Sequence, residues 1–251
     1  MNKIALITGG SRGLGKDMAL TLAKKGVGVI LTFQNKKEEA NAVVNAIKGL
    51  GQKAAALQLD VSDATHFGSF INQVGAILKE VFTTSKIDYL INNAGVGIHT
   101  PYADTTEEQF DSMVNIHLKS AFFLTQKMLP VINDGGAIVN VSTGLARFTL
   151  PGYDAYAIMK GGIETLTKYQ AKALGVRGIR VNVMAPGAIE TDFGGGAVRD
   201  NKDINAFIAS QTALGRVGKP DDIGSVVAFL CSDEAKWING QRLEASGGMF
   251  L

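Results

Sequence analysis

Residues 3–26 read KIALITGGSRGLGKDMALTLAKKG and join a short apolar run to a glycine-rich turn and a longer amphipathic segment. The apolar run at 3–8 is typical of a buried strand. In the third part, apolar residues recur at intervals of four, which predicts a helix over 14–25 that ends before Gly26. A strand that leads through glycines into a helix begins a βαβ unit. The stretch therefore predicts an α/β fold.

The same alternation continues along the rest of the chain. The expected strands are 3–8, 27–33, 53–59, 87–92, 136–141, 178–184 and 240–245. Strands separated by helices pair in parallel through right-handed crossovers. We therefore expect residues 1–251 to form a single-domain, Rossmann-type, doubly wound parallel sheet of seven strands. Ligands of such sheets bind beyond the carboxyl ends of the strands.

The charge balance narrows the class of partner. The chain carries 25 Lys and Arg against 23 Asp and Glu, without a long run of like charge, so neither nucleic acid nor a membrane surface is expected. No basic leader precedes the first strand, and no stretch approaches the roughly 20 apolar residues of a membrane span. The single Cys231 is expected to be a buried core residue in a reducing compartment. We expect a cytoplasmic protein that acts on a small molecule.

The loop TGGSRGLG at residues 8–15 lies between the first strand and the first helix. Glycines there let the backbone turn tightly and approach a pyrophosphate, and the helix N-terminus offers free N–H groups. The loop predicts a dinucleotide site; because its spacing is G-x-x-x-G-x-G and not the commoner G-x-G-x-x-G, a plain βα turn is the alternative. The residues expected to bind the cofactor here are Gly9, Ser11, Arg12, Gly13, Leu14 and Gly15.

The end of the second strand bears on the choice of cofactor. Gln34 follows Phe33 there, in place of the acidic residue that would bind the adenosine ribose of NAD(H). Arg12 lies in the glycine loop, and Lys36 and Lys37 follow the strand. A cation near the ribose favours a 2′-phosphate, so NADP(H) is predicted. Lysines at a helix start are also ordinary solvated charges, so NAD(H) remains the alternative.

Three further strand ends carry polar or glycine-containing sequences: Asp60-Val61, NNAG at 92–95 and PGAIET at 186–191. With the TGxxxGxG loop and the YxxxK of Tyr156 and Lys160, these motifs resemble, in order and spacing, the short-chain dehydrogenase/reductase family. The resemblance extends from Thr8 to Gly248. It implies that Tyr156 and Lys160 form the catalytic acid/base pair. The cofactor-binding residues it implies are Asp60 and Val61 at the adenine, Asn93, Ala94 and Gly95 beside the adenosine ribose, Lys160 with Tyr156 at the nicotinamide ribose, and Pro186, Gly187, Ile189 and Thr191 towards the nicotinamide.

The spacing of Tyr156 and Lys160 has a physical reason. Residues four apart share one face of a helix, about 6 Å apart along its axis, so both can reach one cofactor and one carbonyl. An unperturbed tyrosine has a pKa of about 10. A nearby ammonium favours the phenolate, so we expect Lys160 to lower the pKa of Tyr156.

Two adjacent hydroxyls compete for the position of the family's substrate-binding serine. Counting back from Tyr156 places Thr143 there, with Ser142 beside it. Neighbouring residues on an extended chain point to opposite sides, so only one can bond the substrate oxygen. We favour Thr143, whose hydroxyl can make the same bond, with Ser142 as the alternative.

The segment NIHLKS, residues 115–120, departs from the family pattern. The resemblance implies an asparagine that helps to hold a water in a proton relay, and ungapped alignment places His117 at that position and Asn115 two residues earlier. We expect His117 to hold the water or to carry the proton, since its unperturbed pKa is about 6.5. A buried spacer is the alternative.

Other features complete the predicted site. Residues 193–218 contain a run of glycines and a short helical segment, and are expected to form a substrate lid. Phe148, Tyr153 and Phe193 are expected to line the substrate pocket, with core packing as the alternative. Ser246 stands where the family usually has an acid or amide. No metal site is expected, because the three histidines lack partners at ligand spacing.

Together, the motifs predict an NADPH-dependent oxidoreductase that reversibly reduces a ketone to a secondary alcohol. Thr143 and Tyr156 would hydrogen-bond the ketone oxygen, and Tyr156 would give the proton. A small carbonyl or alcohol substrate is favoured, and the resemblance suggests a homotetramer. The alternatives are a 3-oxoacyl-thioester reductase, a sugar or alcohol dehydrogenase that uses NAD, and a nucleotide-sensing regulator. An extended-branch dehydratase or epimerase normally needs a longer C-terminal region than this chain has.

Overall fold

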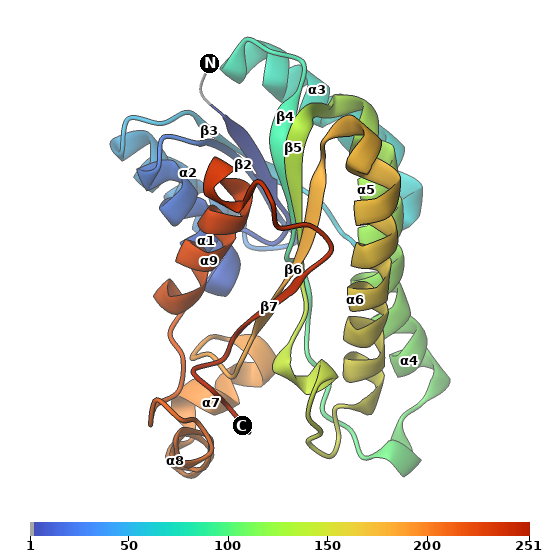
Figure 1. The fold of residues 1–251 in the computed structure, drawn as a ribbon, viewed down its shortest axis with the longest axis vertical. Coiled ribbons are helices and arrows are strands. Elements are labelled where there is room, and N and C mark those ends of the chain that lie inside the picture. The colour runs from blue at the N-terminus through green and yellow to red at the C-terminus, as the bar shows by residue number, and fades with distance from the viewer. Residues whose placement is uncertain (1–2) are drawn as a thin grey trace.

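The computed structural model describes residues 3–251 and shows one parallel sheet in the order β3-β2-β1-β4-β5-β6-β7 (Figure 1). Its strands are β1 Ile4–Ile7, β2 Gly28–Phe33, β3 Ala54–Gln58, β4 Ile87–Asn92, β5 Ile132–Val141, β6 Arg180–Pro186 and β7 Arg242–Ala245. This confirms the predicted seven-stranded, doubly wound fold. The first two residues of the expected domain lie outside the described residues. Strand β5 begins earlier than predicted, because Ile132 pairs with Ile87 ahead of a bulge.

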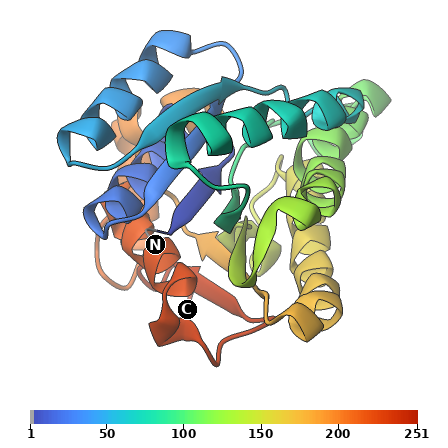
Figure 2. The same ribbon diagram turned by 90° about the horizontal axis from the view of Figure 1, so that it is seen from above.

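Helices cover both faces of this sheet (Figure 2). They are α1 Gly13–Lys24, α2 Lys37–Gly49, α3 Phe67–Ile77, α4 Glu107–Met113, α5 Ser120–Met128, α6 Asp154–Leu174, α7 Ala197–Asp200, α8 Lys202–Ser210 and α9 Asp221–Cys231. Side chains alternate along a strand: on β1, Ala5 and Ile7 pack with α1, α2 and α9, whereas Ile4 and Leu6 pack with α3, α5 and α6. The alternation divides the core into two layers, and buried Cys231 belongs to the first of them.

The strand order reverses between β1 and β4, which are hydrogen-bonded neighbours. The buried Thr8 hydroxyl joins the two loops that leave these strands. Its oxygen accepts hydrogen bonds from the backbone N–H of Asn93 at 2.9 Å and of Ala94 at 3.0 Å. Ligands of open α/β sheets bind at such a reversal point, so Thr8 holds together the two loops from which a dinucleotide site is built.

The segment after β6 folds back on the sheet before it continues into α9. Ile189 forms a parallel bridge with Gly218, and α7 and α8 lie between them. The C-terminal residues Met249 and Phe250 pack against this segment through Ile208, and the C-terminus lies close to α7 (Figure 1). In the described part of the chain, no helix combines the length and the apolar character needed to cross a membrane.

The tie through Thr8 can be tested by removing its hydroxyl. Thr8→Val keeps the shape of the side chain but leaves the N–H groups of Asn93 and Ala94 without their acceptor. An unsatisfied buried donor costs about 1–3 kcal/mol, so urea unfolding should show a free energy of unfolding lower by about 2 kcal/mol. Thr8→Ser, which keeps the hydroxyl, is the control. Equal stability of the two variants would contradict this role.

Candidate active site

Four loops meet at the carboxyl edge of the sheet, because all its strands run in the same direction. They follow β1, β4, β5 and β6 and carry the glycine turn, the NNAG turn, the Ser142-Thr143 pair and the Pro186-Gly187 pair. Helix α6 lies against β6 and presents Tyr156 and Lys160 to the same edge. The predicted nucleotide-binding and catalytic residues therefore converge.

The glycine turn has the geometry of an anion cradle. Gly9 and Gly13 have φ of 65° and 53°, in the left-handed region that side chains disfavour. A Cβ on Gly15 would overlap the Gly9 carbonyl. Ser11 is buried in the turn, and Leu14 packs on the core. Helix α1 starts here with no side-chain cap and no acid in its first turn, so its free N–H groups and positive dipole end fit a pyrophosphate.

The NNAG turn supports this cradle. Asn93 Nδ2 donates to the carbonyl oxygens of Thr8 at 2.9 Å and Gly9 at 3.0 Å. Ala94 packs closely on the turn, since a Cβ on Gly9 would lie 3.0 Å from the Ala94 Cα. The side-chain amide of Asn93 thus braces the glycine turn from within the protein.

On the adenosine side, Gln34 Nε2 donates to Asp60 Oδ2 at 2.9 Å. Asp60 Oδ1 also accepts from the backbone N–H of Ser62 at 2.9 Å. Burial acts to raise the pKa of Asp60, but hydrogen bonds from Ser62 and Gln34 outweigh it and lower the pKa below its ordinary value. Asp60 is therefore a carboxylate held in place at the end of β3, next to Val61.

Both predicted phosphate-binding cations have acidic partners. Arg12 Nη1 lies 3.2 Å from Asp192 Oδ2, and Lys36 Nζ lies 3.5 Å from Glu39 Oε1. Their side chains are 53% and 56% exposed. Exposed ion pairs contribute little free energy, so either cation can exchange its partner for a phosphate.

Tyr156 and Lys160 are both buried, at 6% and 4% exposure. Lys160 Nζ donates to the carbonyl oxygen of Val141 at 2.7 Å and lies 5.6 Å from the centre of the Tyr156 ring. The Thr143 side chain acts on the pKa of the Tyr156 phenol as a hydrogen-bonding partner. The structure thus brings three of the predicted catalytic residues together.

The predicted lowering of the pKa of Tyr156 is wrong for the protein without a ligand. Burial raises the pKa of this phenol above its ordinary value, against the opposing effect of the Thr143 hydrogen bond. Burial also lowers the pKa of Lys160 to about 7. An environment of low polarity disfavours both charges, so at neutral pH Tyr156 is a protonated phenol and Lys160 is close to its titration midpoint.

Ser142 and Thr143 point to opposite sides of the chain, as extended neighbours do. Ser142 Oγ donates to Glu164 Oε1 at 2.8 Å and lies 3.4 Å from the carbonyl oxygen of Lys160. Thr143 faces Tyr156 and also accepts from the N–H of Leu145 at 3.3 Å. Of the two predicted hydroxyls, Thr143 is the one placed beside the phenol.

His117 lies next to this group on a π-helical segment, Val114–Lys119, which separates α4 from α5. Its ring is 5.1 Å from the Tyr156 ring, edge to face. A Cβ on Gly95 would lie 2.6 Å from His117 Cε1, so the glycine lets the imidazole approach the NNAG turn. A π-helical turn widens a helix locally, often at functional sites.

The hydrogen bonds of His117 define its protonation. Nε2 lies 2.8 Å from the carbonyl oxygen of Val96, and since a carbonyl only accepts, Nε2 carries the hydrogen. Nδ1 is then a lone pair, buried without a partner among residues 3–251. Burial, followed by the charge of Lys160, lowers the pKa of His117 to about 3. The neutral imidazole can accept a hydrogen bond at Nδ1 but does not take up a second proton at neutral pH.

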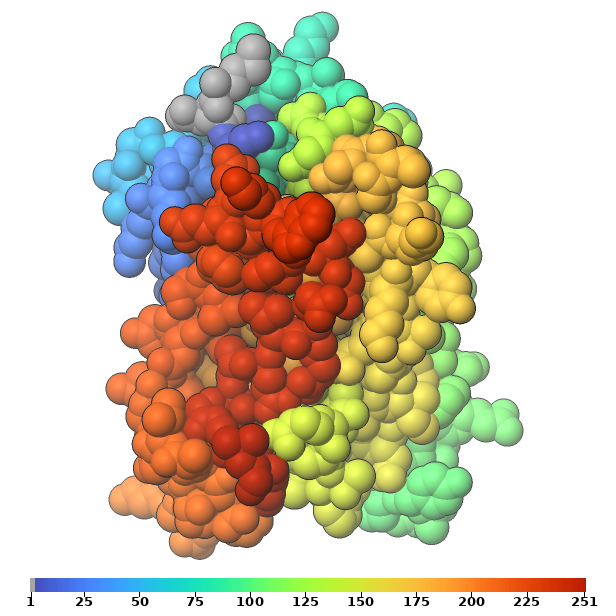
Figure 3. Space-filling view, in the orientation of Figure 1, coloured from blue at the N-terminus to red at the C-terminus, as the bar shows by residue number. Residues whose placement is uncertain are grey.

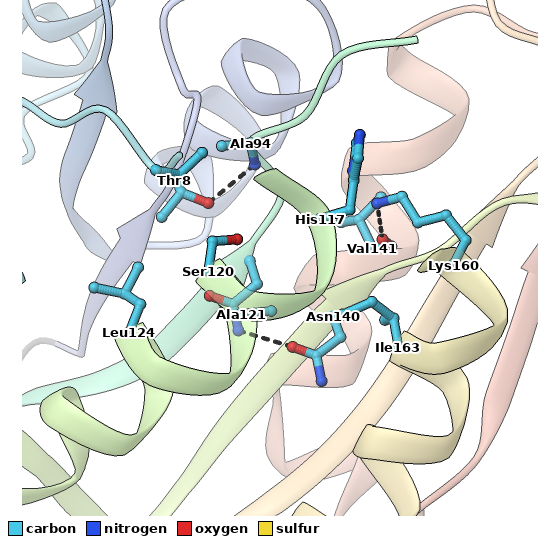
Figure 4. A pocket seen from close by; sticks show the side chains of 12 residues that line it. Thr8, Ala94, His117, Ser120, Ala121, Leu124, Asn140, Val141, Lys160 and Ile163 are labelled. Atoms are coloured by element: carbon cyan, nitrogen blue, oxygen red, sulfur yellow. Dashed lines mark hydrogen bonds between the residues drawn. The ribbon is translucent and has the colours of Figure 1, made fainter. Parts of the chain in front are cut away.

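A small cavity with a mixed polar and apolar lining lies between His117, Lys160 and the ends of β1, β4 and β5 (Figure 4). Asn92 and Asn140 line it, and Asn92 Nδ2 donates to Asn140 Oδ1 at 2.8 Å. Asn92 Oδ1 is buried and has no partner in the described part of the chain. The two buried acceptors without a partner in the described residues, Asn92 Oδ1 and His117 Nδ1, thus belong to residues that line one cavity together with Lys160, a setting that suits ordered water.

The residues predicted towards the nicotinamide follow β6. Pro186 ends the strand, and a Cβ on Gly187 would lie 2.8 Å from the Ser246 Cα. After the bridge at Ile189, Thr191 reaches the glycine turn, 3.6 Å from the position of a Cβ on Gly13. The segment therefore spans from the sheet edge to the predicted pyrophosphate site.

The three predicted pocket walls differ in their surroundings. The Phe193 ring lies 5.4 Å from the Tyr156 ring, and Tyr153 packs edge to face on His99 at 5.0 Å. Phe148 instead packs against Phe250 at 4.8 Å, within the apolar cluster that includes Ile208 of α8. Of the three, Phe193 is thus the aromatic residue next to the Tyr156 phenol. Phe148 packs in the apolar core, which was the alternative to a place in the substrate pocket.

Sequence reasoning missed a cluster of charges behind Thr143, formed by Arg147, Glu164, Arg242 and Glu244. Two signals were available. Glu164 follows Lys160 by four residues, and Arg242 and Glu244 alternate along β7, so that they share one face of the strand, with Ser246 directly after it.

Comparison with known proteins relates this architecture to a family of oxidoreductases. A family described as Enoyl-(Acyl carrier protein) reductase matches residues 9–250. The 3-oxoacyl-[acyl-carrier-protein] reductase FabG of Staphylococcus aureus is 38% identical, over 100% of this chain and 99% of that protein. An uncharacterized oxidoreductase of Methylorubrum extorquens is 36% identical, over 98% of this chain and 97% of that protein.

Solved structures agree with this relationship. The promiscuous reductase LugOII, which catalyses keto-reduction at C1 during lugdunomycin biosynthesis, has a TM-score of 0.94 and 36% identity, over 99% of this chain and 98% of that one. The angucycline C-6 ketoreductase LanV with bound NADP has a TM-score of 0.94 and 33% identity, over 99% of this chain and 95% of that one.

Burial of Lys160 predicts a gain in stability when its charge is removed. Since the pKa of Lys160 falls to about 7, the unfolded chain binds more protons between about pH 7 and 10. The cost of burial is therefore complete below pH 7 and fades as pH rises. Without cofactor, Lys160→Met should unfold on the order of 3 °C or more above the wild type at pH 6, with a smaller gain at pH 10.

The matched control for this experiment is Lys168→Met, on an exposed position of the same helix. It should change the melting temperature little at either pH. A Lys160→Met protein that melts below the wild type at pH 6 would show that the Val141 hydrogen bond outweighs the cost of burial.

Proposed function

The chain belongs to the short-chain dehydrogenase/reductase family, as a NAD(P)-dependent oxidoreductase, and from this premise we propose that it reduces a ketone to a secondary alcohol with NADPH. One observation carries the proposal: the Tyr156 phenol is buried beside Lys160, and Thr143 acts on its pKa as a hydrogen-bonding partner. A protonated phenol paired with a second hydroxyl can bind and protonate a carbonyl oxygen as it gains electrons.

The glycine turn would hold the cofactor's pyrophosphate, with Asp60 and Val61 at the adenine and Ile189 and Thr191 towards the nicotinamide. When bound, NADPH supplies the hydride. Support for NADPH comes from Arg12 and Lys36, whose exposed ion pairs leave both cations available to a 2′-phosphate, and from the NADP bound to LanV. NAD(H) is the alternative.

Thr143 and Tyr156 would bind the ketone oxygen from one side, and Tyr156 would release its proton to it. The pKa of Tyr156, raised by burial, supports the direction of reduction, because the phenol then stays protonated at neutral and at alkaline pH. Alcohol oxidation uses the same groups but must begin from the less favoured phenolate.

Lys160 and His117 would restore the proton. With a pKa lowered by burial to about 7, Lys160 can exchange protons near neutral pH. The pKa of His117, about 3 after burial, supports a role as hydrogen-bond acceptor for a water and speaks against direct proton transfer. His117 would thus replace the family's asparagine through its Nδ1 lone pair.

Substrate binding involves the surfaces beside Tyr156. Phe193 and the Tyr153–His99 pair offer aromatic contacts, which support a small ketone with an apolar or aromatic substituent. Residues 193–218 would act as the lid. A 3-oxoacyl thioester, the substrate named for the FabG relative, and a sugar or alcohol oxidised with NAD are the alternatives. The complete Tyr156–Lys160 arrangement weighs against a nucleotide-sensing regulator.

We further expect a homotetramer that works in the cytoplasm. Support for assembly comes from exposed apolar side chains on α5 and α6: Phe122 is 45%, Ile158 56% and Tyr169 75% exposed in the single chain. Support for a reducing compartment comes from the buried thiol of Cys231, whose pKa burial raises to about 12.

The proposed reaction is tested by the loss of reduced-cofactor absorbance with a panel of ketones. Tyr156→Phe removes the proton donor, so kcat should fall by about 10²- to 10⁴-fold, while the dissociation constant for NADPH, from fluorescence titration, should change little. Wild-type protein that binds NADPH but turns over no ketone would favour the regulator. Turnover retained in Tyr156→Phe would exclude this phenol as the acid.

Cofactor preference should depend on Arg12. In Arg12→Gln, the KM for NADPH should rise about tenfold or more, because a charged hydrogen bond to phosphate is lost, whereas the KM for NADH should stay the same. Arg199→Gln is the matched control, since Arg199 pairs with the same Asp192 carboxylate at 2.6 Å. If both variants raised the KM for NADPH equally, or if Arg12→Gln raised the KM for NADPH and for NADH equally, Arg12 would be a structural residue of the lid and not a phosphate-binding residue.

A further inference from the structure

Charged residues from α6 and β7 meet behind the strand end that carries Thr143. Glu164 on α6 receives two hydrogen bonds on Oε1, from Ser142 Oγ at 2.8 Å and from Arg242 Nε at 2.6 Å. Arg242 on β7 also donates from Nη2 to the backbone carbonyl of Thr143 at 3.1 Å. The Arg242 and Glu164 side chains are only 23% and 20% exposed, so water screens this pair less than the surface pairs.

These contacts hold Thr143 from the side opposite its hydroxyl. The Ser142 side chain is held by Glu164, the Thr143 carbonyl is held by Arg242, and the Thr143 side chain points towards Tyr156. The backbone at Thr143 is extended, with φ −161° and ψ 156°. Because the Ser142 side chain and the Thr143 carbonyl are both held, the Thr143 hydroxyl can point only to the opposite side.

The same carboxylate connects Thr143 to the catalytic helix. Glu164 follows Lys160 by one helical turn, so a contact that fixes Glu164 against β5 also fixes the height of Lys160 and Tyr156 relative to the strand. Thr143 and Tyr156 come from different elements, and their mutual distance depends on this connection.

A second arm extends the cluster to the C-terminus. Glu244 pairs with Arg242 Nη1 at 2.7 Å and with Arg147 Nη2 at 2.7 Å, and Arg147 Nη2 donates to the carbonyl of Met249 at 2.7 Å. Ser246 Oγ donates to Glu244 Oε1 at 2.7 Å. The serine that stands where the family usually has an acid or amide therefore has a structural partner. In Figure 3 the yellow-green segment after β5 lies against the dark red C-terminal residues.

We propose that Glu164 and Arg242 are positioning residues, which aim the Thr143 hydroxyl at Tyr156 and thereby set the rate of proton transfer without contacting substrate or cofactor. The inference rests on the proposed ketone reduction. It assigns to the charge cluster an effect on kcat, whereas a cofactor-binding role would change KM for NADPH.

Arg242→Gln and Glu164→Gln should each lower kcat by about tenfold to a hundredfold, as small misplacements of reacting groups do, with the KM for NADPH unchanged. The double variant should be no worse than the stronger single variant, because both act through one contact. Arg177→Gln is the matched control: Arg177 also pairs with a carboxylate, Asp134 at 2.7 Å, and with backbone carbonyls, but at the opposite end of β5.

The pH profile separates positioning from general destabilisation. The Thr143 hydrogen bond lowers the pKa of Tyr156, so its weakening should raise that pKa. In Arg242→Gln and Glu164→Gln, the alkaline limb of kcat for ketone reduction should therefore move to higher pH. In Arg177→Gln the limb should stay in place. An equal kcat loss in Arg177→Gln, or an unmoved limb in both cluster variants, would overturn the proposal.

A readout that needs no turnover keeps this inference distinct from the proposed function. The methyl resonance of Thr143 in threonine-labelled protein, assigned by its absence in Thr143→Ser, should shift in Arg242→Gln and Glu164→Gln and not in Arg177→Gln. An unshifted resonance in both cluster variants would overturn the inference even if the wild type reduces ketones. Wild-type inactivity with shifted resonances would instead reject the proposed reaction and retain the positioning.

Discussion

The Thr8 hydroxyl joins the loops after β1 and β4, where the strand order of the sheet reverses. The other residues of the site pack outward from these two loops. Asn93 and Ala94, which it holds, close the glycine turn from one side. Gly95 then admits the His117 ring, which packs edge to face on Tyr156. A parallel sheet forces these loops to a common edge, but their spacing depends on close contacts that side chains at the glycines would prevent.

Burial sets the protonation states of Tyr156, Lys160 and His117. It raises the pKa of Tyr156, lowers the pKa of Lys160 to about 7 and lowers the pKa of His117 to about 3. All three shifts favour the neutral form of the group. Folding thus places a protonated phenol, an amine near its titration midpoint and a neutral imidazole side by side, at a cost in stability. Perturbed titrations of this kind concentrate at functional sites, in agreement with an oxidoreductase of this family.

Much of this arrangement could be predicted from motifs, because the strands along the chain and the spacing of residues on a helix follow from local sequence patterns. The glycine turn, the Tyr156–Lys160 spacing and the buried Cys231 are of this kind. The predicted shift of the Tyr156 pKa was wrong, because a spacing of four residues reports proximity to an ammonium but not how deeply both groups are buried. Phe148 was expected to line the pocket, with core packing as the alternative, and it packs on Phe250, more than 100 residues away along the chain.

The periodicity of apolar residues and the order of the motifs were enough to predict the seven parallel strands, the edge at which the site is expected and the residue types available there. The packing of the tertiary structure determines which of Ser142 and Thr143 faces Tyr156, because Glu164 holds the Ser142 hydroxyl and Arg242 holds the Thr143 carbonyl. It also decided the neutral tautomer of His117, which the Val96 carbonyl sets. These partners are distant in sequence, and their hydrogen bonds exist only once α6 and β7 have packed against β5 and β6.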